Sequence, residues 1–265
     1  MMRALWTAAT GMTGQQMNVD VISNNLSNVN TTAYKKDRVE FKDLVYSQMN
    51  RGYNIESNDM AAPMQVGFGA AASATLKDFS VGNFSASENP TDLAIDGSGF
   101  FTLQNEKGEI VYTRDGSFKV STLEDERVLV NSQGYPVLDD TGEMIMLEEN
   151  DVENMIVASD GQISFNIDGT ITDSGIRIGV IQFANPSGLE NLGGNNYRAT
   201  EASGQPVWET DENRSVMLQN YLEGSNVDLV DEMVNLIVAQ RAYEVNSKIV
   251  QASDDMLNQA NNLRR

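Results

Sequence analysis

Residues 5–29 read LWTAATGMTGQQMNVDVISNNLSNV, in which mainly apolar side chains recur at alternating intervals of three and four. This spacing predicts one seam of an amphipathic helix. The helix is expected to run about 25 residues, or roughly 40 Å, before residues 30–32 and the pair Lys35 and Lys36 end it. The seam positions are Leu5, Ala8, Met12, Gln15, Val19, Ile22, Leu26 and Val29.

A second long helix is predicted at the C-terminal end, where Ser225 or Asn226 is expected to cap the free amides and Asp228 favours the positive helix end. Two apolar stripes run along this helix, so it requires more than one neighbour. The first stripe is Val234, Val238, Ala242, Val245, Ile249, Ala252, Met256, Ala260 and Leu263; the second is Leu229, Met233, Leu236, Tyr243, Val250 and Leu257.

These terminal helices either pair with each other as a self-contained bundle or pack against copies of the chain. Two helices alone bury too little apolar surface, and soluble monomers avoid large exposed apolar patches, so we expect burial against copies. The charge distribution agrees: residues 1–52 carry +2, residues 226–265 carry −2, and the whole net charge of −20 lies in residues 53–225. Nearly neutral ends can pack densely, whereas the acidic middle would repel itself.

Residues 70–219 change to short β-prone runs separated by Gly, Asp and Asn. The clearest runs are residues 99–103, 110–113 and 117–120. Turn dipeptides that accept positive φ and favour hairpins follow the same segment: Asp96-Gly97, Lys107-Gly108, Asp115-Gly116, Asp160-Gly161 and Asp168-Gly169. The sequence therefore predicts an α+β protein in which long terminal helices flank a central, mainly antiparallel β domain.

The composition argues against catalysis and cofactor binding. Cysteine and histidine are absent, which removes thiolates, imidazole bases and the commonest zinc ligands. Residues 97–99, Gly-Ser-Gly, lead into a strand and lack the Gly-Lys-Ser/Thr of a phosphate loop. Residues 139–143, Asp-Asp-Thr-Gly-Glu, lack the ligand spacing of a calcium loop, so we interpret them as a hairpin. No enzyme activity, cofactor or metal is expected.

Two further segments limit the choice of partners. Clustered Lys and Arg for phosphate binding are lacking, so nucleic acid is not an expected partner. Tyr34, Lys35, Lys36 and Arg38 beside Phe41 form a small basic and aromatic cluster, which we interpret as a packed connector. No run of about 18 apolar residues and no cleavable signal is visible.

The polar end of the first predicted helix carries an ordered motif. Residues 23–35, SNNLSNVNTTAYK, resemble the N-terminal motif shared by flagellar rod and hook proteins. The resemblance extends to residues 89–101, 112–118 and 230–244. Ala33 stands where the family often has Gly, and Tyr34 where Phe is common. The chain is thereby identified as a member of the flagellar axial family.

The resemblance implies a structural subunit exported through the flagellar type III apparatus. Residues 17–22 and the connector from Tyr46 to Pro63 most resemble distal rod subunits; a proximal rod or hook subunit is the near alternative, and a secreted β-domain adhesin or enzyme the remote one. Expected partners are copies of the chain, proximal rod and hook proteins, basal-body ring proteins and the export apparatus. The expected location is the basal body in the cell envelope, which is periplasmic if an outer membrane is present.

The expected domains are residues 1–34 and 221–265 as the helices of an assembly core, 35–70 as an extended connector and 71–220 as the outer β domain. The connector, marked by Tyr46 and Pro63, is expected to set the stiffness of the polymer. The expected assembly-interface residues are Leu5, Met12, Val19, Ile22, Asn24, Asn25, Leu26, Asn28, Val234, Val238, Tyr243, Val245, Ile249, Met256 and Leu257.

Overall fold

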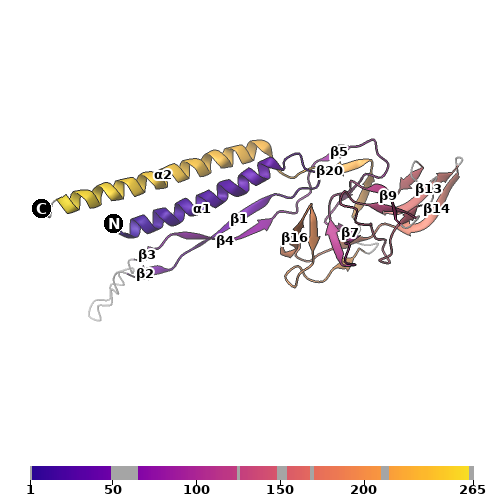
Figure 1. Ribbon diagram of the computed structural model, residues 1–265, viewed down its shortest axis with the longest axis horizontal. Helices are drawn as coiled ribbons and strands as arrows, with labels where there is room; N and C mark the ends of the chain where they lie inside the picture. Colours follow the sequence, from indigo (N-terminus) through magenta and orange to yellow (C-terminus); the bar gives the residue numbers. More distant parts are fainter. Residues whose placement is uncertain are drawn as a thin grey trace, which may run out of the picture. The chain divides into compact units, whose positions relative to one another are not determined.

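The computed structural model describes residues 2–48, 65–123, 126–147, 154–167, 170–209 and 215–262. Two long helices stand at the two ends of the chain, and antiparallel strands fill the sequence between them (Figure 1). The predicted α+β class is therefore confirmed. Neither described helix is long and apolar enough to cross a membrane.

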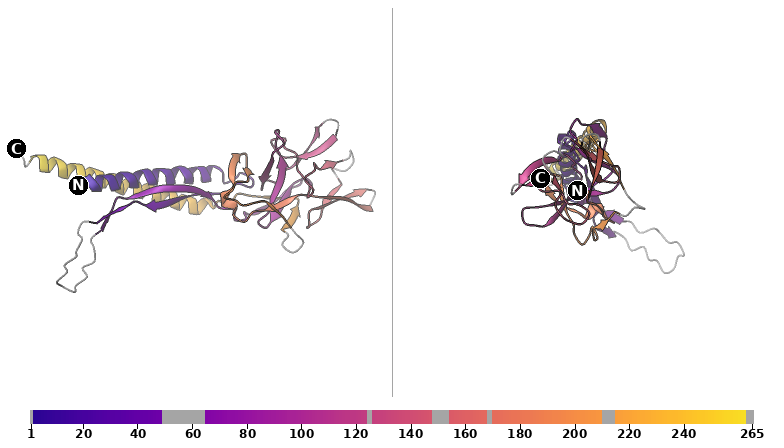
Figure 2. Two further views of the ribbon diagram at one scale, coloured as in Figure 1. Left: turned by 90° about the horizontal axis from the view of Figure 1, so that it is seen from below. Right: turned by 90° about the vertical axis from the view of Figure 1, so that its right-hand side faces the viewer.

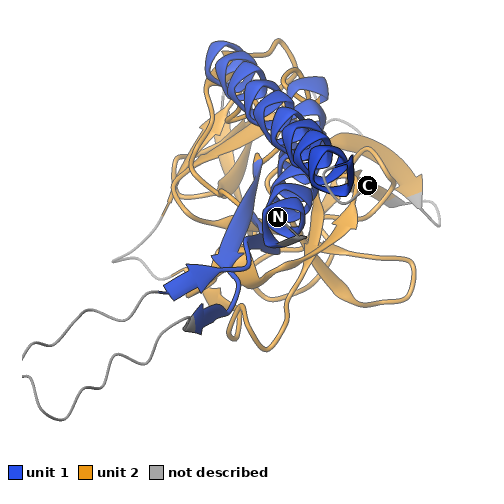
Figure 3. Ribbon diagram, turned by 90° about the vertical axis from the view of Figure 1, so that its left-hand side faces the viewer, with its two compact units in different colours: residues 1–27, 37–76, 228–265 blue, residues 28–36, 77–227 orange. Residues whose placement is uncertain are grey.

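Contacts divide the chain into two compact units, and the chain passes from one to the other four times (Figure 3). The first unit holds residues 1–27, 37–76 and 228–265, and the second holds residues 28–36 and 77–227. The predicted boundary at residue 70 coincides with the start of a strand that belongs to the first unit. The predicted domain limits stay a prediction.

The first unit is built on helices α1 (Met2–Ser27) and α2 (Leu229–Asn262), which lie side by side in Figures 1 and 2. The Asp228 carboxylate caps α2, because it accepts the N–H groups of Val230 and Asp231 at 2.8 and 3.2 Å. The predicted caps Ser225 and Asn226 accept other N–H groups: Ser225 accepts the Val227 N–H, and Asn226 accepts the Lys36 N–H. Asp228 lies directly before the first helical residue, which is the N-cap position.

Two strand pairs complete the first unit. Strand β1 (Asp37–Asp43) pairs with β4 (Ala70–Lys77), and β2 (Tyr46–Gln48) pairs with β3 (Gln65–Gly67). Helix α1 packs against β1, where Gly14 leaves room for the Phe41 ring: a Cβ added at Gly14 would lie 3.1 Å from it. Residues 35–70, predicted as an extended connector, thus include the strands β1, β2 and β3.

The second unit is centred on a six-stranded antiparallel sheet, with smaller antiparallel sheets around it. The central order is β16 (Glu190–Gly193), β17 (Asn196–Arg198), β8 (Ile110–Thr113), β7 (Phe100–Gln104), β15 (Val180–Gln182) and β18 (Val207–Trp208). The smaller sheets are β9 (Lys119–Leu123), β10 (Glu126–Val130) and β11 (Met146–Leu147); β12 (Met155–Val157), β13 (Gln162–Ile167) and β14 (Thr170–Arg177); β6 (Leu93–Asp96) with β19 (Val216–Gln219); and β5 (Phe84–Ala86) with β20 (Tyr221–Glu223). A short 3-10 helix, η1, spans Pro186–Gly188.

The central strands are apolar on both faces, so both faces of the sheet are covered. Successive residues of a strand point to opposite faces: Phe101 and Val111 lie in one buried cluster, whereas Phe100 and Tyr112 lie in another. The second cluster packs aromatic rings edge to face, with the Phe100 and Phe183 centroids 5.7 Å apart. These two cores account for the tight packing of the central β domain.

Several predicted turns are present, and one works differently. Gly108 and Gly161 adopt φ of 80° and 81° at the β7–β8 and β12–β13 connections, as their turn dipeptides predict. Gly116 does not have positive φ; it is needed for space, because an added Cβ would lie 1.6 Å from the Leu93 carbonyl oxygen. The Asp168-Gly169 turn lies outside the described residues.

The acidic loop at residues 139–143 is a tight turn, as predicted. The Asp139 carboxylate accepts the backbone N–H groups of Thr141 and Glu143, and Leu138 bridges Met144 across the loop. Its acidic side chain is therefore occupied by the backbone amides of the loop. In the part of the chain that the structure describes, no three acidic groups converge on a metal-sized space.

Candidate assembly interface

Helix α2 leaves one long apolar face uncovered, here called the outer face. Its residues recur at helical spacing over about seven turns, and Val230 and Val238 are 62% and 61% exposed. An exposed large side chain is ordinary when it stands alone, but a continuous row marks an interaction surface. The outer face consists of Val230, Val234, Ile237, Val238, Val245, Ile249 and Met256.

The opposite face of α2 is the one that is buried, and its most deeply buried side chains are small or polar. Glu232, Ala239 and Ser253 are buried there, seven or fourteen residues apart. Asn246 continues this row and lies against α1, since a Cβ added at Gly11 would come within 2.9 Å of its amide nitrogen. Leu236, Val250 and Leu257 are half-buried beside this row, so the inner face also has an apolar part, while the large side chains of the outer face stay uncovered.

The structure places the predicted interface residues of α1 mostly between core and surface. Ile22 and Asn25 are buried, Asn24 is exposed, and Leu5, Met12, Val19, Leu26 and Asn28 are half-buried. In α2 the predicted residues Val234, Val238, Tyr243, Val245, Ile249 and Met256 are exposed, and Leu257 is half-buried. Tyr46 is exposed on β2, and Pro63 lies outside the described residues. Their role in assembly stays a prediction.

Two outer-face residues, Val230 and Ile237, were missed by the sequence analysis. The two stripes predicted for this helix are narrow and leave out both residues, although a helix without supercoil presents a wider apolar stripe at a period of 3.6. Counting every apolar side chain within about 100° of Val234 would have found both. The row of small and polar residues at seven-residue intervals was an equally visible signal for the inner face.

Asn25 has a definite task inside the first unit. Its amide nitrogen donates to the Asp37 carbonyl oxygen at 2.9 Å, and its amide oxygen accepts the Asp37 N–H at 2.9 Å. Asn25 is 2% exposed, so water could replace neither bond without rearrangement. This paired contact ties the end of α1 to the start of β1 across twelve residues.

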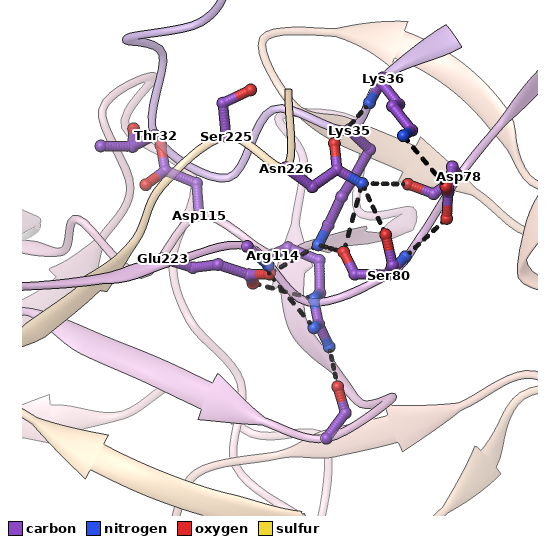
Figure 4. Close-up of polar contacts among 12 residues, drawn as sticks. Thr32, Lys35, Lys36, Asp78, Ser80, Arg114, Asp115, Glu223, Ser225 and Asn226 are labelled. Carbon is purple, nitrogen blue, oxygen red and sulfur yellow. Dashed lines mark hydrogen bonds and ion pairs between the residues drawn. The ribbon is translucent and has the colours of Figure 1, made fainter. Parts of the chain in front are cut away.

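The second unit holds a cluster of buried charges that sequence reasoning did not find. Lys35, Arg114 and Glu223 are buried and form ion pairs with one another through the Glu223 carboxylate (Figure 4). Burial lowers the pKa of Lys35, against the opposing effect of the Glu223 carboxylate beside it. The basic and aromatic residues at 34–36 are packed within the chain, which agrees with their interpretation as a connector. No signal in the sequence pairs residues so far apart.

Neighbouring polar groups extend this cluster along residues 28–36. The Asp115 carboxylate interacts with Thr32, and burial raises the pKa of Asp115. Asn195 donates to the Thr32 carbonyl oxygen at 2.7 Å, and Lys77 lies over the Tyr34 ring at 5.3 Å. Residues 28–35, the part of the polar motif that follows α1, therefore make their contacts within the second unit.

The architecture defines a class: a protein with long terminal helices, of which α2 exposes an apolar face, and a central β region that carries the net charge. Family models agree over three segments. Residues 5–35 match the "Flagella basal body rod protein" model, 94–165 the "Flagellar hook protein FlgE/F/G D1 domain" model, and 218–263 the "Flagellar basal body rod FlgEFG protein C-terminal" model.

Similar proteins extend the match to the whole chain. The chain is 45% identical to the flagellar basal-body rod protein FlgG of Borreliella burgdorferi, over 100% of both chains. It is 41% identical to FlgG of Buchnera aphidicola, over 99% of this chain and 100% of that one, and 30% identical to the flagellar hook-basal body complex protein FlhP of Bacillus subtilis, over 100% of both. The chain belongs to the FlgG family of flagellar basal-body rod proteins, the distal rod type that the resemblance predicted.

Proposed function

We propose that the chain is a structural subunit of the distal flagellar rod and that it polymerises through the outer face of α2. The observation that carries this proposal is the outer face of α2, a continuous row of Val, Ile and Met side chains that the single chain leaves exposed. Covering a row of large apolar side chains is favourable by about 25 cal/mol per Å² of apolar surface. Copies of the same chain supply such a surface without a new partner.

The terminal helices form the torque-bearing layer in this proposal. Interlocked helices transmit torque by close packing and need no covalent chemistry, so the chain acts without catalysis or a cofactor. Residues 71–220 form the outer layer, where the −20 charge of residues 53–225 opposes dense packing. The connector residues Tyr46 to Pro63 hold neighbouring subunits and keep the polymer straight.

The remaining partners follow from the place of a distal rod subunit. The named relatives are basal-body rod and hook-basal body proteins, which supports contacts with proximal rod proteins, hook proteins and basal-body rings. Export through the flagellar type III apparatus would deliver the chain to the basal body, inside the periplasm where an outer membrane exists.

The test is Ile249→Asp, with Gln251→Asp as the matched control on another side of the same turn. Ile249 is 42% exposed in the single chain, so the variant should fold and keep its helicity by circular dichroism. Burial of an unpaired carboxylate in a dry contact costs several kcal/mol, so polymers should disappear in sedimentation and electron microscopy, and motility should be lost.

Gln251→Asp adds the same charge at an exposed position outside the outer face and should polymerise normally. Polymers of Ile249→Asp that match those of the unmodified chain in yield and length would show that the outer face is not the contact surface.

A further inference from the structure

Three charged side chains from distant parts of the sequence meet in the interior of the second unit. The Lys35, Arg114 and Glu223 side chains are 0%, 1% and 0% exposed. Lys35 Nζ lies 2.6 Å from Glu223 Oε1, and Arg114 Nε lies 3.1 Å from Glu223 Oε2 (Figure 4). Two cations therefore share one carboxylate, and a buried charge without a counter-ion is strongly unfavourable.

The two cations depend on Glu223 to different degrees. Arg114 also donates to the carbonyl oxygens of Gly97 and Gly99, and its guanidinium lies 5.6 Å from the centre of the Phe100 ring. Lys35 also donates to the Ser80 carbonyl oxygen at 2.7 Å. Arg114 is held by its own part of the sheet, so Lys35 has more to lose when the carboxylate is removed.

The backbone around Lys35 rests on the same C-terminal segment. Ala33 N–H donates to the Glu223 carbonyl oxygen at 2.8 Å, and Lys36 N–H donates to Asn226 Oδ1 at 2.8 Å. The Asn226 amide in turn donates to the Asp78 carbonyl oxygen, and Asp78 N–H donates to the Lys36 carbonyl oxygen. Residues 28–36 are thus hydrogen-bonded to residues 223–226 and to Asp78, the first residue after β4.

We propose that Glu223 is a charge lock that makes docking of residues 28–36 onto the second unit conditional on the presence of residues 220–227. If the C-terminal segment is absent, docking would bury the Lys35 ammonium beside the Arg114 guanidinium without the Glu223 carboxylate, and the Asp78 carboxylate, which acts on Lys35 more weakly, is paired with Lys36. If the segment is in place, the same burial is compensated, and Glu223 and Asn226 also form backbone and amide bonds with Ala33, Tyr34 and Lys36. Residues 28–36 can therefore dock with their charges neutralised only in a chain that also has residues 220–227.

The lock goes beyond the polymerisation proposed above, because it concerns the single chain. Residues 28–36 directly follow α1 in the sequence, and residues 223–227 directly precede Asp228, the cap of α2. A chain that has not received its C-terminal part would keep the residues after its first helix undocked. The polar motif at the end of α1 then serves as a check that the chain is complete.

The experiment compares hydrogen exchange in the dilute, full-length chain and in its Glu223→Gln, Lys35→Met and Lys35→Met/Glu223→Gln variants. The reporter amides are Ala33, Lys36 and Asp78, whose bonds form with the lock, and the reference amides are Val137 and Leu138 in the core. Glu190→Gln is the control, since it removes a carboxylate from an exposed ion pair with Arg198.

Glu223→Gln should speed exchange at the three reporters at least tenfold more than at the two reference amides. Lys35→Met/Glu223→Gln, which also removes the surplus cation, should reverse at least half of this increase in exchange rate on a logarithmic scale. Lys35→Met and Glu190→Gln should each change the exchange rates of the reporter amides less than threefold. Three results would each overturn the lock: equal loss of protection at reporter and reference amides, no loss of protection in Glu223→Gln, or no recovery of protection in the double variant.

Recovery is the decisive comparison. If Glu223→Gln fails to fold, a double variant that folds with protected reporters still supports the lock, and a double variant that also fails to fold overturns it.

Discussion

Ala33 adopts a backbone conformation that suits glycine. Its φ is 54°, and the other described non-glycine residues with positive φ, Asn195 and Asn220, are of a type that tolerates this region. Ala33 is also buried, and its N–H is bonded to Glu223. The departure from the Gly that the family often has at this position therefore carries a local strain of about 1–2 kcal/mol.

Ala33→Gly is expected to change the free energy of unfolding by less than about 1 kcal/mol, because relief of the strain offsets the lost methyl burial and the added chain entropy. Ala94→Gly is the matched control: Ala94 is fully buried in β6 and does not have positive φ, so it should lose about 1–2 kcal/mol. Urea unfolding of the β domain measures both. Equal losses would mean that Ala33 is unstrained.

The contact between Asn25 and β1 belongs to the scale of elements, because it fixes where the chain turns after α1. Both polar groups of the Asn25 amide are used and buried. Asn24, its neighbour in the same motif, is exposed. Neighbouring asparagines in one motif therefore have separate tasks, and the order of the motif matters more than its asparagine content.

Asn25→Ala should reduce the stability of the first unit by about 1–3 kcal/mol, because it leaves the Asp37 N–H and carbonyl oxygen without these partners. Gln16→Ala, at an exposed position of α1, should cost less than about 0.5 kcal/mol, as is usual for surface changes. Thermal unfolding followed by circular dichroism at the helix band measures the difference. A larger loss in Gln16→Ala than in Asn25→Ala would contradict the role given to the Asn25 side chain.

The exposed outer face of α2 bears on the stability of the first unit as a whole. The fully buried residues of α2 are small or polar and its larger inner residues are only half-buried, so α2 removes only a part of its apolar surface from water in the single chain. The β domain, in contrast, buries two apolar clusters. The two units should therefore differ in local stability.

Trypsin tests this difference on the whole molecule. In the dilute chain, Arg241 and Lys248 of α2, both exposed, should be cut well before Arg114 and Lys35, which are buried, and residues 77–227 should survive. In the polymer, cuts at Arg241 and Lys248 should slow at least tenfold, because the outer face is covered. Cuts at α2 that are as slow as those at Arg114 in the dilute chain would indicate a self-contained fold.

The local features of this protein follow from its sequence. Apolar stripes at helical spacing predicted both helices, β-prone runs and turn dipeptides predicted an antiparallel β middle, and the motif at residues 23–35 with three further stretches predicted the flagellar axial family. These signals are readable because each depends on residues within a few turns or strands of one another. The glycine at 116 was misread, since its need for space against Leu93 depends on a segment more than twenty residues away.

Two decisions belong to the tertiary structure alone. Which face of α2 is left open depends on where Gly11 meets Asn246, and the lock joins Lys35 to Glu223 across 188 residues. In a helix with apolar residues on several sides, the sequence pattern does not predict which side the rest of the chain covers. The sequence likewise does not predict which residue is the counter-ion of a buried charge. Both are decided only when distant elements are brought into register, because packing and charge pairing act over a few ångströms in space, whatever the separation along the chain.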